Sequence, residues 1–166
     1  MKYELNKLDK SLKNFLASFL IVLSIGVGVG LIFVNQTTNF SAEGAVERFN
    51  GSGEYEDDNF EIKENYAKSV SEMLMTTHNH IIGFSFIFFM NGLIFYFNSI
   101  IKGFWKNFLL IEPFLSILLS FGSIWGMRFI HSGFVYVTVI SAILMYASFF
   151  LMAGISLYEL KIKRSL

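Results

Sequence analysis

The sequence predicts an all-α membrane protein with four transmembrane helices in an up-down-up-down bundle and one extracytoplasmic loop. Of its 166 residues, 54% are hydrophobic and only 16% are charged, whereas a soluble domain carries about 25% charged residues. The apolar residues gather in four long stretches, and most basic residues flank alternate ends of these stretches. Lipid is therefore expected to be the main solvent of the chain.

The first apolar stretch, residues 15–34, is long enough to cross a bilayer core of about 30 Å as a helix. It exceeds the apolar region of about 7–15 residues found in secretion signals, and no clear small-residue cleavage site follows it. We therefore expect an uncleaved anchor. Gly26 and Gly30 form a G-x-x-x-G pattern, which predicts close packing against another helix of the same chain.

The loop that follows, residues 35–70, is polar and acidic, with too few apolar residues for a core of its own. We expect it to lie over the bundle as a lid. A helical pattern begins near residue 62, so the second helix is predicted to start outside the membrane, before its apolar part at residues 81–99. The last two stretches, residues 108–129 and 133–157, are joined by a very short turn, which predicts antiparallel neighbours. The chain thus forms a single membrane domain.

Basic residues predict the orientation, because short cytoplasmic segments are enriched in lysine and arginine. The two terminal segments and the loop between the second and third helices share one side, and they hold Lys2, Lys7, Lys10, Lys13, Lys102, Lys106, Lys161, Lys163 and Arg164. The opposite side is rich in aspartate and glutamate. Both termini are therefore predicted to be cytoplasmic, in a bacterial inner membrane.

All three histidines are then expected at the extracytoplasmic end. His78 and His80 point about 200° apart on a regular helix, so they cannot both bind one ion or one haem. His131 follows the third helix, and antiparallel packing predicts a similar membrane depth for it. The three histidines are therefore expected to meet in one layer.

A b-type haem is one cofactor that this layer fits. Either His78 or His80 would ligate one face of the haem and His131 the other, while Arg128 pairs with a propionate. The many phenylalanines would supply an apolar pocket.

Three other chemistries use the same histidines. Copper would add the thioethers of Met73, Met75 and Met127. Zinc would add a carboxylate from the loop, and without a metal the cluster would respond to protons near physiological pH. The same residues also fit a polar cluster that caps helices or contacts another subunit and binds no cofactor.

Glu112 is predicted to lie inside the third span, where an unpaired carboxylate costs several kcal/mol. It should face inward, and Ser18 or Tyr96 is expected to be its hydroxyl partner. A role in proton entry or at a quinone site competes with a purely structural hydrogen bond next to Pro113 and with snorkelling of the side chain towards Lys106. Asn91, near mid-membrane, is expected to hydrogen-bond between helices.

Four short segments carry a resemblance to other proteins: Gly30-Leu-Ile-Phe33, Gly44-Ala-Val-Glu47, Thr77-His-Asn-His80 and Ile111-Glu-Pro-Phe114. Through these segments, the chain resembles a group of uncharacterised bacterial inner-membrane proteins with four helices. This resemblance implies the topology rather than a chemistry. The H-x-H pair is also similar to that of haem–copper oxidases, which implies haem binding, although there are too few helices and histidines for an oxidase subunit.

The leading hypothesis is therefore haem binding, or copper or zinc binding, for electron transfer in a respiratory assembly. A non-catalytic accessory or assembly subunit, in contact with other membrane subunits or a second copy, is the alternative. A small transporter is third, because the spans between the histidines and Glu112 look almost wholly apolar. Motifs of hydrolases and nucleotide-binding enzymes are absent from the sequence, so no autonomous enzyme is expected, and nothing indicates nucleic-acid binding.

Overall fold

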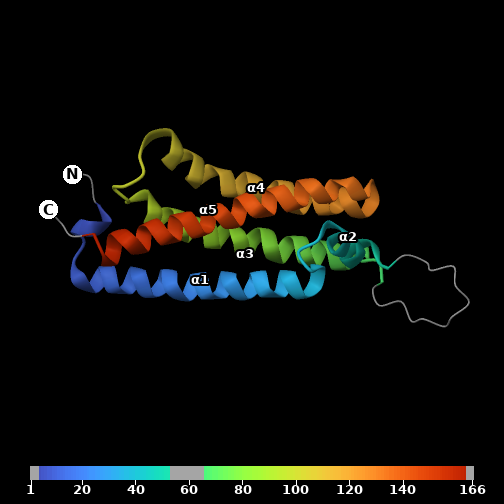
Figure 1. Cartoon of the computed structure of the whole chain (residues 1–166), viewed down its shortest axis with the longest axis horizontal. Coiled ribbons are helices and arrows are strands. Elements are labelled where there is room, and N and C mark those ends of the chain that lie inside the picture. Colours follow the sequence, from blue (N-terminus) through green and yellow to red (C-terminus); the bar gives the residue numbers. More distant parts are fainter. Residues whose placement is uncertain (1–3, 53–65, 164–166) are drawn as a thin grey trace, which may run out of the picture.

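Four long helices run in alternating directions in the computed structural model, which describes residues 4–52 and 66–163 (Figure 1). Their bounds are Lys10–Thr38 for α1, Val70–Tyr96 for α3, Gly103–Phe129 for α4 and Val135–Lys161 for α5. All four are long and apolar enough to cross a membrane. The described part of the chain contains no strand, and the predicted all-α fold with four spans is confirmed. Both termini lie at one end, here called the terminal end, and the opposite end is the far end.

Helix α1 is longer than its predicted apolar core because polar residues cap both of its ends. The Oδ1 of Asp9 accepts a hydrogen bond of 3.0 Å from the N–H of Leu12, as an N-cap residue does. At the other end, Asn39 adopts a left-handed conformation with φ of 49° and ends the helix.

A short helix, α2 (Ala42–Asn50), follows almost directly and occupies part of the predicted loop. A Cβ on Gly44 would lie 2.2 Å from the carbonyl oxygen of Thr38, so glycine is needed for this tight connection. Helix α2 contacts the far ends of α4 and α5, and the Nδ2 of Asn50 donates a hydrogen bond of 3.2 Å to the carbonyl of Met127. The far end of the bundle is therefore partly covered by ordered structure.

Helix α3 begins later than the sequence pattern predicts. Ser69 and Glu72 form a capping box, in which the N–H of Ser69 donates to the Glu72 carboxylate at 2.8 Å. This cap starts the helix at Val70. Residues 66–69 are not helical, and the remainder of the predicted start, residues 62–65, lies outside the described residues.

Helices α4 and α5 make the most extensive helix contact in the described structure. Small side chains let helix backbones approach closely in lipid, and both helices carry buried serines: Ser116, Ser120 and Ser123 on α4, and Ser141, Ser148 and Ser156 on α5. In the apolar stretch of α4, 50% is buried inside the bundle, whereas the corresponding value for α1 is 17%. Helix α1 is therefore the outermost span, and α3 and α5 separate it from α4 (Figure 1).

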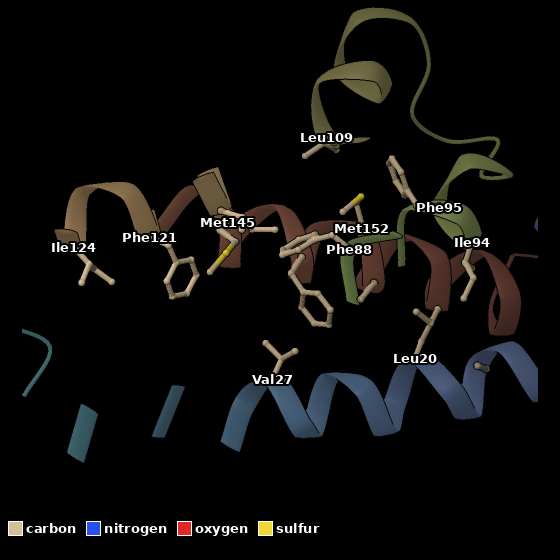
Figure 2. Packing of buried hydrophobic residues seen from close by; sticks show 14 of the residues in the cluster. Leu20, Val27, Phe88, Ile94, Phe95, Leu109, Phe121, Ile124, Met145 and Met152 are labelled. Atoms are coloured by element: carbon tan, nitrogen blue, oxygen red, sulfur yellow. The ribbon is translucent and has the colours of Figure 1, made fainter. Parts of the chain in front are cut away.

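The apolar core fills the space between the helices (Figure 2). Leu20 and Val27 point from α1 toward the side chains of α3 and α5, among them Phe88 and Met145. The rings of Phe88 and Phe149 meet edge to face, with centroids 6.0 Å apart. Such aromatic pairs join α3 to α5 in the middle of the bundle.

The glycine pattern of α1 does not pack as the sequence predicts. A Cβ on Gly26 or Gly30 would find no atom within 4 Å, so the prediction of close packing within the chain is wrong. Helix α1 meets the other helices through its buried residues Ala17, Leu20 and Val27 instead. The two glycines line an apolar groove of about 350 Å³ at the α1 surface.

Candidate functional site

Two contacts set the register of α3 against α4 near the far end. The Nε1 of Trp125 donates a hydrogen bond of 2.9 Å to the Oγ1 of Thr77. One turn deeper, the ring of His80 lies 5.3 Å from that of Phe121. His80 is therefore level with the middle of the half of α4 nearer the far end, not with the end of that helix.

The side chain of His80 is held in one tautomer. Its Nδ1 lies 2.8 Å from the carbonyl oxygen of Thr76. A carbonyl only accepts hydrogen bonds, so Nδ1 must carry the proton. The neutral ring then has a free lone pair on Nε2, and the rings of Phe84 and Phe121 flank it at 5.9 and 5.3 Å.

His131 has the opposite tautomer because it caps the 3₁₀ helix η2 (Ser132–Phe134). Its Nδ1 accepts a hydrogen bond of 2.9 Å from the N–H of Gly133. The proton of the neutral ring is then on Nε2. As a ligand through Nε2, His131 would have to lose that proton or give up its cap.

The three histidines do not share one layer, which corrects the expectation from the sequence. His131 follows Phe121, the neighbour of His80, by ten residues, eight of them in α4, which is about 12 Å along a helix. His78 is exposed on a different side of α3 from His80. Among residues 4–52 and 66–163, no group of three or more histidines and carboxylates is placed to hold one metal ion.

The other residues predicted for a haem or copper site are also separated. The Nε of Arg128 donates a hydrogen bond of 3.0 Å to the carbonyl of Lys68, so Arg128 ties down the segment before α3. Met73 and Met127 are buried in the apolar core, whereas Met75 is 65% exposed. The structure therefore does not gather the predicted thioethers on one face.

Glu112 faces inward as predicted, but its partners differ from the predicted ones. Ser116 donates a hydrogen bond to its Oε1, and Ser148 of α5 donates one of 2.5 Å to its Oε2. Ser18 lies on the exposed surface of α1. The ring of Tyr96 is 58% exposed and lies 5.2 Å from the Nζ of Lys106. Both predictions are wrong, because α1 lies on the other side of the bundle from α4 and the exposed side chain of Tyr96 meets Lys106 instead.

Asn91 forms the interhelical hydrogen bond that the sequence predicts. It is fully buried on α3, and its Nδ2 donates a hydrogen bond of 3.1 Å to the carbonyl of Phe149 on α5. Its Oδ1 is buried without a hydrogen-bond partner in the described structure. Because Phe149 follows Ser148, Asn91 lies at about the depth of Glu112.

The helix interior between Glu112 and the far end is more polar than the sequence indicates. Ser120 and Ser123 are buried on α4, and the Oγ of Ser123 lies 2.7 Å from the Oγ1 of Thr138 on α5. The argument that this region is almost wholly apolar is therefore wrong. Serines recur along α5 at intervals of seven and eight residues, and this pattern in the sequence indicates a polar helix interior.

A second buried carboxylate, Glu159, was not singled out from the sequence. It is 0% exposed near the terminal end of α5 and accepts hydrogen bonds from the N–H and Oγ of Ser99, at 2.8 and 2.5 Å. The Nζ of Lys163 lies 3.9 Å from its Oε1. The sequence signal for Glu159 is its position at the end of an apolar span, four residues before a lysine on the same helix.

A family model of transmembrane helical domains, Aq_1264_TM, matches residues 39–165 of this chain. The chain belongs to this family. The match supports the resemblance to a family of membrane proteins, and together with the four spans it identifies an integral membrane protein. No curated protein and no solved structure matches the chain significantly.

The Aq_1264_TM match covers α2 to α5 and leaves out α1. All the histidines and the buried residues Asn91, Glu112 and Glu159 lie inside it. Helix α1, outside the match, is also the least buried span. The family domain therefore coincides with the three helices that carry the polar interior.

Proposed function

We propose that this chain is a bacterial inner-membrane subunit that binds a b-type haem through the Nε2 of His80 and passes electrons within a respiratory assembly. The observation that carries the proposal is the hydrogen bond between the Nδ1 of His80 and the carbonyl of Thr76. Histidines that ligate metals usually donate their other ring N–H to a carbonyl or a carboxylate, which fixes the ring and raises the basicity of the ligating nitrogen. The aromatic flanks of His80 would pack on an apolar macrocycle.

A second residue to hold the haem would come from another chain. His80 is exposed on its own chain, and His131 is engaged as a cap. A symmetric pair of copies would present two His80 side chains to each other across a two-fold axis. A different membrane subunit would instead supply its own ligand, so the ratio of haem to chain distinguishes the two arrangements.

The proposed orientation places both termini in the cytoplasm. The terminal end carries Lys102, Lys161 and Lys163, which supports this orientation under the positive-inside rule. His80 would then lie toward the outer face. Fusion of a reporter that fluoresces only in the cytoplasm to the carboxyl terminus tests this: fluorescence is expected, and its absence with a well-inserted protein would reverse the orientation.

The decisive test is a visible spectrum of the purified protein, oxidised and reduced with dithionite, before and after addition of haem. Metal analysis of the same sample tests for copper and zinc, which the free Nε2 would also accept. We expect a reducible Soret band that is lost in His80→Ala. His78→Ala is the matched control, since it removes an exposed histidine two residues away, and it should keep the band.

His131→Ala discriminates between the structure and the arrangement expected from the sequence. If His131 only caps η2, its replacement should leave the haem spectrum unchanged. A wild-type protein that stays colourless after haem addition and holds no metal would overturn the proposal. The non-catalytic accessory subunit would then be the better account.

A further inference from the structure

We infer that Glu112 is a proton-binding site inside the membrane domain, and that its proton exchanges with water at the terminal end of the bundle. This inference does not rest on haem binding at His80. It rests on the burial of Glu112, on the chemistry of its two partners and on two buried polar atoms that have none.

The surroundings of Glu112 favour a neutral carboxyl group. The side chain is buried within a membrane span, and the groups that face it are Ser116 on its own helix and Ser148 on α5. No described lysine, arginine or histidine lies within ion-pair distance of it. A negative charge without a cation is costly in hydrocarbon, so a bound proton is the natural way to neutralise it.

The two serines fit both protonation states of the carboxyl group. Each hydroxyl can donate one hydrogen bond and accept others. Ser116 and Ser148 donate to the two oxygens of an ionised Glu112, and one of them can rotate to accept from the acid O–H when the proton is bound. Both contacts can therefore be kept when the site gains or loses a proton.

Two unpaired polar atoms mark the route toward the terminal end. The Oδ1 of Asn91 and the Oγ of Ser156 are buried in the membrane helices without partners among the described residues. Such atoms are usually satisfied by internal water. Asn91 lies at the depth of Glu112, whereas Ser156 lies two turns further toward the terminal end and one turn before Glu159.

The route ends where water has access. Ser148, Ser156 and Glu159 all lie on the buried face of α5, and Ser148 and Glu159 are about 16 Å apart along the helix. Lys163, which contacts Ser99 and Glu159, is partly exposed. Toward the far end, in contrast, Ser123 and Ser141 bond to carbonyls of their own helices, and the unpaired buried side-chain atom found there among the described residues, the Oδ1 of Asn50, lies on α2 and outside the four spans.

Infrared spectroscopy of the full chain in proteoliposomes tests the inference. At neutral pH, we expect a carbonyl band of a protonated carboxylic acid that disappears entirely in Glu112→Gln. Glu159→Gln is the matched control and should retain it. Labelling the wild type with ¹³C-glutamate should shift the band, which assigns it to glutamate even if the Glu112 variant does not fold.

Transfer to D₂O then tests the exchange. The band should shift as the acid proton is replaced, and Ser156→Ala should slow this shift several-fold, whereas Ser141→Ala, a buried serine on the other side of Glu112, should not. Identical spectra for wild type and a folded Glu112→Gln would overturn the proton site. A band that never shifts in D₂O would mean a sealed structural hydrogen bond, and an equal rate in Ser156→Ala would overturn the route.

Discussion

The Nε1 of Trp125 donates a hydrogen bond of 2.9 Å to the Oγ1 of Thr77, and this contact between α4 and α3 aligns the two helices at the far end. The indole N–H can only donate, and Trp125 is half-buried between the two helices. The register that it sets brings His80 next to Phe121. The depth of His80 is therefore coupled to a polar contact one turn away.

Thr77→Val should destabilise the bundle by about 1–2 kcal/mol, because it keeps the shape of the side chain but leaves the indole N–H without an acceptor. Thermal unfolding in detergent, followed by circular dichroism, measures the effect. Thr76→Val is the control, since no hydrogen bond of its side chain is present among the described residues. Equal losses in the two variants would mean that the hydrogen bond to Trp125 contributes nothing.

Gly126→Ala should destabilise the turn between α4 and α5. The added Cβ would lie 2.7 Å from the ring of Phe134, so η2 or the ring must move, at a typical cost of about 1–3 kcal/mol. Gly122→Ala is a matched variant one turn earlier, where an added Cβ meets no atom within 4 Å. If both variants melt at the wild-type temperature, the close approach of Phe134 does not constrain the fold.

Gly26→Ala should leave the isolated chain as stable as the wild type, or more stable by up to about 1 kcal/mol. The added methyl group meets open space, and alanine favours a helix over glycine. The comparison of melting temperatures in dilute detergent checks this. A clear loss of stability would show that the glycines of α1 pack against another helix after all.

The pH response of Glu4 at the terminal end follows from one ion pair. A hydrogen bond from Lys7, whose Nζ lies 3.0 Å from the Glu4 carboxylate, lowers the pKa of Glu4 below its ordinary value. Stability from this pair is present above the pKa of Glu4 in the unfolded chain and is lost as the pH falls through the folded value. Lys7→Met should therefore raise the pKa of Glu4, measured by NMR of ¹³C-labelled glutamate, and an unchanged titration would contradict the assigned cause.

The four spans could be predicted from the sequence, because a stretch of about 20 apolar residues is directly visible there. The hydrogen-bond partners of Glu112 could not be predicted in this way. Depth along the membrane is available from counting residues, but which helices are neighbours depends on packing. Serines are compatible with any apolar span, so nothing in the sequence distinguishes Ser148 on α5 from Ser18 on α1 as the partner of Glu112.

The histidines show a second limit of sequence reasoning. The spacing of His78 and His80 predicts different directions on a helix, and both are exposed residues of α3. The difference between His80 and His131 depends on which ring nitrogen carries the proton, and this is set by single hydrogen bonds to Thr76 and Gly133. Both contacts are local, four and two residues apart along the chain, but the spacing alone does not say which ring nitrogen donates or accepts, so the tautomers had to come from the structure.

Glu159→Ala should destabilise the terminal end of the bundle by about 1–3 kcal/mol. Glu159 accepts two hydrogen bonds from Ser99, and its loss leaves the N–H of that residue without its acceptor. Glu159→Gln keeps an oxygen acceptor and should recover most of the stability, because Lys163 is partly exposed and can be solvated. Hydrogen exchange of the Ser99 amide gives a local readout: it should speed up strongly in the alanine variant and only slightly in the glutamine variant. Equal exchange in both variants and the wild type would mean that Glu159 does not hold the loop between α3 and α4.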